Sequence, residues 1–386
     1  MPPFLAAYLF AAQLPVWGRL SNLQRVDNPL STDFQLWRGF NVGWTSSSAP
    51  DLPVRPSLDG RISYMKVVVA DPPGGPENLK YIDQPILEPG PGEALVKLEA
   101  IGVNFIDVYF RTAFYKAPET PIKLGNEGAG TVAAVGPDVN IPIGQRVAYA
   151  MARGSYGEFA VVPQKVLTEL PRNVSFENGA AVMLQGMTAH YLTRSTFPLK
   201  SGDTCLVHAA AGGAGLLIVQ LAKIAGATVI GTVSTKEKAQ LAREHGADHI
   251  ILYTEQDFVA EVKRITANKG VDVVYDSVGK TTFHKSLDCL RPRGMMVTFG
   301  QSSGGVGEID PLVLSQKGSL FLTRPTLAQY ISDPAELKQR SSDLFKWLAE
   351  GRLKLQIHKT YNLKDAAEAH RALEARESSG KLLLKP

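Results

Sequence analysis

The feature that most constrains this chain is a glycine-rich turn between a short apolar strand and an amphipathic helix. TCLVH at 204–208 predicts the strand, and AAAGGAG at 209–215 predicts the turn. The apolar face of the following helix recurs every three or four residues, through Ala214, Leu217, Ile218, Leu221 and Ala225. Such a turn places backbone N–H groups and a helix N-terminus against a pyrophosphate. The sequence therefore predicts a dinucleotide site; the alternative is a tight turn that binds nothing.

Strands and helices alternate after this turn. TVIGTV (228–233), HIIL (249–252), VDVVYD (271–276) and GMMVTFG (294–300) read as strands with helical sequence between them. This alternation predicts an α/β fold with a doubly wound parallel sheet. Ser234 and Glu237 predict a capping box for one helix, and Asp333 followed by Pro334 predicts the start of a long one.

The preceding segment, 65–162, is rich in strands and punctuated by Gly and Pro. EALVKLEAIG, EGAGTVAAVG, QRVAYA and GEFAVV are short apolar runs, which predict a small β-barrel or sandwich. A helix is predicted from about 175 to 193. The chain ends with a helix over 364–376 and a strand over 381–386.

The first 64 residues have a different composition. They contain no Lys, Glu, Cys or His, but they hold three of the four Trp and seven Pro, and SSSAPDLPVRPS at 46–57 reads as linker. The change at Met65 favours an over-extended translation start, or a disordered extension. The Arg and Ser content leaves a mitochondrial presequence as the alternative.

Composition excludes several classes of protein. The 41 Lys and Arg against 37 Asp and Glu give a net charge of only +4, so we expect no nucleic-acid partner. No apolar run approaches the ~20 residues of a membrane helix, so we expect no membrane partner. Two cysteines cannot form a disulfide framework and indicate a reducing compartment. We expect a cytoplasmic protein, or a mitochondrial one if 1–64 is a presequence.

The second strand indicates which dinucleotide is bound. Ala210, Gly212 and Gly215 occupy the three fingerprint positions of the turn. An NAD enzyme would place an acid at the end of the next strand, where this chain has Val233, followed by Ser234 and Lys238. Hydroxyl and ammonium groups suit a 2′-phosphate, so the sequence predicts NADPH. The alternative is a solvated helix N-terminus.

Residues 65–386 resemble the quinone oxidoreductase (zeta-crystallin-like) branch of the medium-chain dehydrogenase/reductase superfamily. The resemblance rests on segments spread along the chain: AIGVNFIDVYFR at 100–111, LGNEGAGTVAAVG at 124–136, LQGMTAHYL at 184–192, HAAAGGAGL at 208–216, YDSVG at 275–279, VTFGQSSG at 297–304, QKGSL at 316–320 and TRP at 323–325. The first 64 residues have no counterpart in the family.

The resemblance implies a GroES-like β-barrel catalytic domain interrupted by a Rossmann domain. We expect the catalytic domain to begin with 65–188. The NADP-binding Rossmann domain would cover 189–324, and 325–386 would return to the catalytic domain. The family also implies a homodimer.

Zinc-dependent relatives bind metal through a Cys, a Gly-His-Glu and a second Cys. Here the first position corresponds to Asn104, the second motif reads Gly125-Asn126-Glu127, and no Cys stands near Leu184 and Gln185. Catalytic zinc needs at least three protein ligands. We therefore expect no metal.

Site residues follow from the resemblance. Asn104, Tyr109 and Tyr115 would form the catalytic pocket, although Asn104 with Asp107 could instead only stabilise a turn, and the tyrosines could be half-buried surface groups. His208 and Cys289 are expected to be packed. The residues expected to bind the cofactor are Thr188, Ala210, Gly212, Gly213, Ala214, Gly215, Ser234, Lys238, Tyr253, Ser277, Val278, Phe299, Gly300 and Arg376.

Three functions remain open at this point. The first is NADPH-dependent, metal-free reduction of quinones, with ortho-quinones as the expected class. The second is NADPH-dependent reduction of an enone or alkenal double bond on the same framework. The third, from another class, is AU-rich RNA binding or a structural, crystallin-like role. No RNA-recognition motif or basic–aromatic stripe supports the third.

Overall fold

The structure is a computed structural model, and it describes residues 63–386. The predictions for the N-terminal extension lie outside this range, except at its last two residues. The first strand begins at Tyr64, one residue before Met65. None of the helices in 63–386 combines the length and hydropathy required to span a bilayer.

The β-rich part of the chain forms two sheets. A three-stranded sheet has the order β2 (Leu79–Pro85), β1 (Tyr64–Ala70), β4 (Ile122–Lys123). The larger sheet contains seven strands: β15 (Ile357–Asn362), β16 (Lys381–Lys385), β3 (Glu93–Val103), β5 (Glu127–Val135), β6 (Arg146–Ala150), β8 (Leu167–Glu169) and, paired with β3, β7 (Phe159–Pro163).

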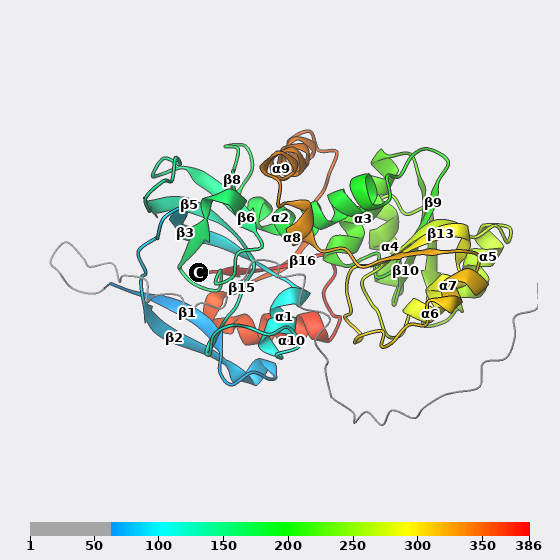
Figure 1. The fold of residues 1–386 in the computed structure, drawn as a ribbon, viewed down its shortest axis with the longest axis horizontal. Helices are drawn as coiled ribbons and strands as arrows, with labels where there is room; N and C mark the ends of the chain where they lie inside the picture. The colour runs from blue at the N-terminus through cyan, green and yellow to red at the C-terminus, as the bar shows by residue number, and fades with distance from the viewer. Residues whose placement is uncertain (1–62) are drawn as a thin grey trace, which may run out of the picture. The chain divides into compact units, whose positions relative to one another are not determined.

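The C-terminal strand closes this β-rich part. Strand β16 runs antiparallel to β3, with Leu382 opposite Val103 and Leu384 opposite Ile101. In Figure 1 the red end of the chain accordingly lies among the blue and cyan elements. The predicted return of the C-terminal segment to the first sheet is therefore present in the topology.

The alternating part of the chain forms a six-stranded parallel sheet. Its order is β11 (His249–Leu252), β10 (Thr228–Val233), β9 (Thr204–Val207), β12 (Val271–Asp276), β13 (Leu290–Thr298) and β14 (Phe321–Thr323). This is the 3-2-1-4-5-6 order of a Rossmann fold, so the doubly wound sheet is confirmed. The direction of winding reverses between β9 and β12, and ligands bind outside the carboxyl ends at such a switch point.

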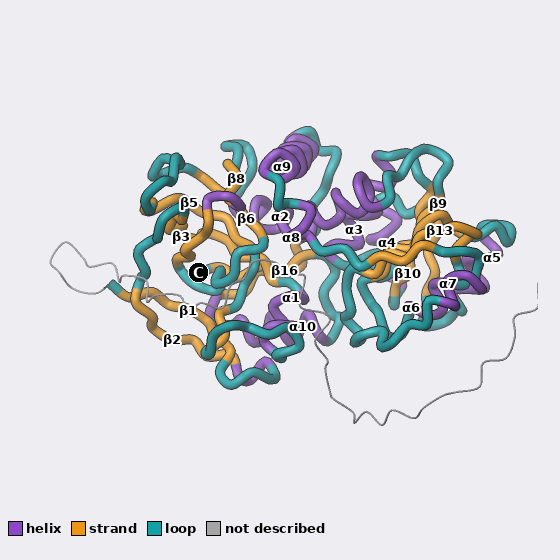
Figure 2. Tube along the Cα trace, viewed as in Figure 1, coloured by secondary structure: helices purple, strands orange, loops and turns teal. Residues whose placement is uncertain are grey.

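Helices cover both faces of this sheet (Figure 2). Val207 and Val229 pack with α3 (Gly213–Ile224) and α4 (Lys236–Glu244) in one buried cluster. Leu206 and Ile230, their neighbours along the same strands, pack on the other face with α5 (Phe258–Ile265) and α6 (Phe283–Leu287). Successive side chains of a strand point to opposite faces, so both faces are apolar.

The remaining helices are distributed along the chain. They are α1 (Phe105–Arg111), α2 (Phe176–Tyr191), α7 (Leu312–Gln316), α8 (Leu327–Tyr330), α9 (Pro334–Ala349) and α10 (Ala366–Glu374). Helix α2 contacts β3 and β5 of the larger sheet and also α3. The domain boundary expected after residue 188 falls inside this helix.

Two predicted helix starts had different outcomes. Asp333 caps α9 through its side chain and Pro334 is the first helical residue, as predicted. The predicted box of Ser234 with Glu237 was wrong, because Thr235 is the N-cap of α4 and its hydroxyl accepts from the Lys238 N–H. The cap moves by one residue because β10 continues to Val233, leaving Ser234 as the link between strand and helix.

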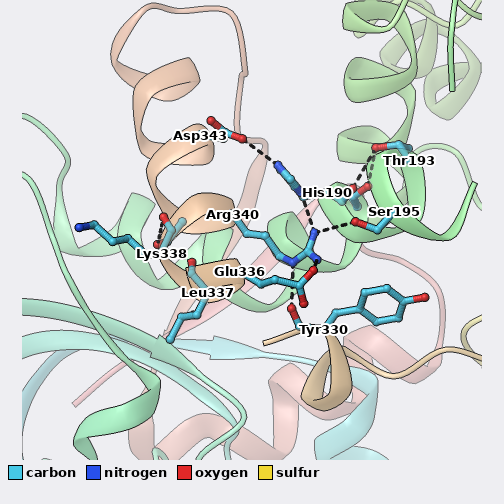
Figure 3. A network of polar contacts seen from close by, with 11 residues as sticks. His190, Thr193, Ser195, Tyr330, Glu336, Leu337, Lys338, Arg340 and Asp343 are labelled. Carbon is cyan, nitrogen blue, oxygen red and sulfur yellow. Dashed lines mark hydrogen bonds and ion pairs between the residues drawn. The ribbon is translucent and has the colours of Figure 1, made fainter. Parts of the chain in front are cut away.

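Helix α9 is fastened to α2 through a buried arginine (Figure 3). The Arg340 guanidinium donates to the Tyr330 carbonyl at 2.9 Å and to the Ser195 hydroxyl at 3.1 Å, and lies 3.2 Å from His190 Nδ1. Glu336, one turn earlier on α9, accepts from it at 2.7 Å. The Tyr330 ring stacks on Tyr191 of α2, with ring centroids 4.2 Å apart.

Candidate active site

One large cavity of about 760 Å³ lies at the carboxyl ends of the parallel strands and reaches α1 and α2. Its wall contains every residue predicted for the site except Ala210. Ala210 is fully buried behind the turn, where its N–H bonds to the Thr232 carbonyl of β10. The structure therefore brings together residues that span from Asn104 to Arg376 in the sequence.

The glycine-rich turn has the geometry of an anion cradle. Gly212 is the N-cap of α3, and no side chain caps this helix end. A Cβ at Gly215 would lie 2.2 Å from the Ala209 carbonyl oxygen, so only glycine allows helix and turn to approach this closely. Ala209, with φ of 51°, makes the turn that a glycine would otherwise make. The open end of α3 can bind the pyrophosphate of a dinucleotide.

The far end of the cavity contains two cations from distant segments. The Lys238 ammonium donates to the Arg376 main-chain carbonyl at 2.5 Å. Burial, and then the charge of Arg376, lower the pKa of Lys238. Neither cation forms an ion pair with an acid within residues 63–386, and Ser234 and Tyr253 lie on the same wall. Two unneutralised cations beside a hydroxyl group fit a phosphate dianion.

The other end of the cavity is aromatic. Tyr109 and Tyr115 meet edge to face, with ring centroids 5.2 Å apart, and Phe105 and Phe114 extend the cluster through Tyr109. The Tyr109 hydroxyl accepts from the Gln301 N–H at 3.1 Å. Burial raises the pKa of Tyr109 to about 12, so this phenol stays protonated at neutral pH. Aromatic walls of this kind suit a planar ring.

Asn104 also lines the cavity. It is the N-cap of α1, and its backbone N–H donates to the Asp107 carboxylate at 2.9 Å. Its side chain donates to Glu127 at 2.8 Å, and its Oδ1 accepts from Lys381 at 2.8 Å and from Gln185 at 3.3 Å. Asn104 is therefore held firmly at the cavity wall as well as fixing a turn.

The positions that correspond to the zinc ligands of relatives do converge, but the donor set does not suit zinc. Glu127 accepts from the Leu184 N–H and from Lys381, each at 2.5 Å. An ammonium group thus already neutralises the Glu127 carboxylate. Within 63–386, no group of three or more His, Cys, Asp or Glu is placed to hold a metal ion.

A buried polar chain supports α1 from behind. Asp107 accepts from Asn126 at 2.8 Å, and the Tyr156 hydroxyl bridges Asp107 at 3.3 Å and His370 of α10 at 2.9 Å. Burial raises the pKa of Asp107 to about 6 and lowers that of His370 to about 3. Arg111, at the end of α1, forms a two-bond ion pair with Glu374 of α10.

The residues expected to be packed are buried. His208 lies 2.9 Å from both the Thr232 and the Ser286 hydroxyls, and burial lowers its pKa. Cys289 and Cys205 are buried free thiols, and burial raises the pKa of both. His208 also borders the cavity, but both its ring nitrogens have partners.

Some residues of this region were absent from the predicted site, among them Gln185, Tyr191, Arg324 and Lys381. The first two stand in LQGMTAHYL and the third in TRP, so the motifs that carried the resemblance contained them. Lys381 lies in the last strand, 277 residues from Asn104, and no local pattern distinguishes it from a strand-end lysine.

Comparison with known proteins agrees with this geometry. The alcohol dehydrogenase GroES-like domain family matches residues 90–172, and the zinc-binding dehydrogenase family matches residues 213–338. A quinone oxidoreductase of Pseudomonas aeruginosa is 48% identical over 315 residues, covering 81% of this chain and 97% of that protein. A 2-haloacrylate reductase of a Burkholderia species is 43% identical over 321 residues, covering 81% and 96%.

A solved structure shows the same fold. The crystal structure of Escherichia coli quinone oxidoreductase complexed with NADPH matches with a TM-score of 0.82 at 45% identity, covering 83% of this chain and 100% of that chain. A GroES-like part and a Rossmann sheet around one cleft define a medium-chain dehydrogenase/reductase. Within that superfamily, the chain belongs to the quinone oxidoreductase family.

Proposed function

We propose that this protein reduces quinones with NADPH and without a metal. The observation that carries the proposal is the pairing, in one cavity, of an aromatic wall with two cations that no acid within residues 63–386 neutralises. The E. coli relative whose solved structure holds NADPH supports the cofactor. The Pseudomonas relative named quinone oxidoreductase supports the acceptor.

Reduction of a quinone requires that the cofactor and the quinone are held in place, and it does not require a strong general acid. NADPH, when bound, supplies a hydride, and a quinone that takes the hydride and one proton becomes a hydroquinone. The turn at Gly212–Gly215 would bind the pyrophosphate, and Lys238 and Arg376 would bind the 2′-phosphate. Tyr109 and Tyr115 would hold the quinone ring against the cavity wall. Because reduced quinone oxygens take protons from water, no residue of the chain has to act as a strong acid.

The decisive experiment is an acceptor panel. Ortho-quinones, para-quinones and enones are each mixed with the protein and NADPH, and cofactor oxidation is followed by absorbance. We expect turnover with quinones, fastest with ortho-quinones, and little turnover with NADH. Faster turnover of enones than of any quinone, or none with any acceptor, would contradict the proposal.

A second function has support from one feature of the cavity. Arg324 lines it, and in the part of the chain that the structure describes its guanidinium bonds to neutral groups alone, among them the Gln301 side chain at 3.1 Å and the Gly300 carbonyl at 3.3 Å. Such a cation could hold the carboxylate of an acrylate, and one relative is a 2-haloacrylate reductase. Under this alternative, Arg324→Gln raises the KM of acrylates and leaves that of uncharged enones unchanged.

We also propose domain bounds, an oligomeric state and a location for this protein. The proposed domain bounds 65–188, 189–324 and 325–386 fit the return of β16 to β3. A homodimer is supported by the edge strand β14, whose Phe321 is 57% exposed. A cytoplasmic location is supported by two buried free thiols.

The RNA-binding alternative has its own test. Salt-dependent retardation of AU-rich RNA by the protein would favour this alternative, for which the cavity offers no explanation.

A further inference from the structure

A buried ion pair stands behind the wall of the cavity, in contact with Asn104. Lys381 and Glu127 have side-chain exposures of 2% and 0%, and their charged atoms are 2.5 Å apart. Neither residue lines the cavity, whereas Asn104 and Gln185, which contact this pair or each other, do. The pair is therefore one layer removed from anything bound in the cavity.

The pair determines how Asn104 is presented. The amide nitrogen of Asn104 donates to Glu127, and its amide oxygen accepts from Lys381. The Asn104 backbone N–H is fixed separately by the Asp107 carboxylate at 2.9 Å. An amide held by an anion at one end and a cation at the other cannot turn over without losing both bonds.

The pair also sets the net charge behind the cavity wall. Glu127 alone would be a buried carboxylate beside a cavity in which negative charge develops on the acceptor oxygen during reduction. A bare buried charge is strongly unfavourable, and it would oppose that developing charge. The Lys381 ammonium cancels it at contact distance.

We propose that Lys381 is a positioning residue of the reduction site. It neutralises Glu127 and fixes the orientation of Asn104, and through Asn104 it fixes the start of α1 and the aromatic wall. The proposal rests on the proposed quinone reduction and deepens it.

The test uses two substitutions that keep side-chain size. Lys381→Met leaves Glu127 without its cation, and we expect kcat to fall by about tenfold or more. The Kd of NADPH, measured by fluorescence, should change by less than about threefold, because Lys238 and Arg376 at the phosphate end are untouched. Adding Glu127→Gln removes the stranded charge and restores a neutral partner for Asn104. The double variant should recover kcat to within about threefold of the wild type, and most of its denaturation midpoint.

Lys385→Met is the matched control, since Lys385 is on the same strand but exposed, and it should behave as the wild type. A wild-type kcat in Lys381→Met, or a double variant as slow as the single one, would overturn the proposal. If the wild type does not oxidise NADPH with any of the acceptors tested, the proposed function itself is wrong. That result is obtained before any variant is compared with the wild type.

Discussion

Lys238 and Arg376 come from segments 138 residues apart, yet a hydrogen bond joins them at one end of the cavity. If they bind the 2′-phosphate, each contributes a charge-assisted bond worth about 1.5–3 kcal/mol, or about ten- to a hundredfold in affinity. Lys238→Ala and Arg376→Ala should each weaken NADPH binding by about that factor. The Kd of NADH should barely change, because NADH lacks the phosphate.

The comparison of the two cofactors is its own control. A variant that disturbed the fold would lose affinity for both dinucleotides. Equal losses for NADPH and NADH, or a wild type that prefers NADH, would show that these cations are only solvated surface charges. Lys236→Ala is the matched variant, because Lys236 is exposed on the same helix turn and does not line the cavity.

The sequence predicts a site residue when neighbouring residues in the chain already indicate its role. The turn at 209–215 and the polar run after Val233 are contiguous, so their chemistry can be derived from neighbouring residues. Arg376 came only from the resemblance, because composition alone would make it a helix-end cation. Lys381 was missed, because its role depends on β16 pairing with β3 and thereby reaching Glu127.

The elements themselves were largely predictable, because the apolar runs are short and clearly bounded. The four strands expected after β9 all form, and α9 begins where Asp333 and Pro334 indicated. The sequence does not fix where a strand stops and a helix starts when two hydroxyl residues are adjacent. Ser234 and Thr235 could each cap α4, and the length of β10 selects Thr235.

Helices α1 and α10 are joined by hydrogen bonds through Asp107, Tyr156 and His370. Their contribution to the free energy of unfolding should depend on pH. The pKa of His370 is about 3 in the fold against 6.5 for the free side chain. Between these values the unfolded chain binds a proton and the folded one does not, so this group destabilises the fold as pH falls below 6.5. At pH 5 the loss is about 2 kcal/mol, at about 1.4 kcal/mol for each pH unit.

His370→Gln removes this dependence, so the stability of the wild type relative to the variant should fall by about that amount from pH 7 to pH 5. Urea denaturation at both pH values measures it. Asp107 acts in the opposite direction, because its pKa, raised to about 6, lets the fold take up a proton as pH falls. Only the difference between wild type and variant isolates His370, and a difference that does not vary with pH would refute the assignment.

At the scale of the whole molecule, the composition of the chain predicts that it works without zinc. Two cysteines are too few for a four-Cys structural zinc site, and Lys381 already pairs with Glu127. The purified protein should carry no stoichiometric zinc by elemental analysis. Prolonged treatment with a chelator should leave the rate of quinone reduction unchanged, and one zinc per chain would rule this out.

The change in composition at Met65 predicts that the folded enzyme begins there. A chain that begins at Met65 loses Tyr64, which is 57% exposed, and the bond from the Ile86 N–H to the Ser63 carbonyl. One such bond contributes about 1 kcal/mol, so this chain should unfold cooperatively and keep its full kcat. Urea denaturation and the quinone assay measure both properties.

A chain that begins at Ala70 is the contrasting variant. It would also lose Met65, Val67 and Val69, which form a buried cluster with Leu95, and Val68, which is buried in a second cluster. Removing four buried apolar side chains should cost several kcal/mol, roughly 2–5 for each, and abolish cooperative unfolding. If the chain from Met65 behaved like the chain from Ala70, residues before Met65 would have to pack on the enzyme, and the extension would be part of its fold.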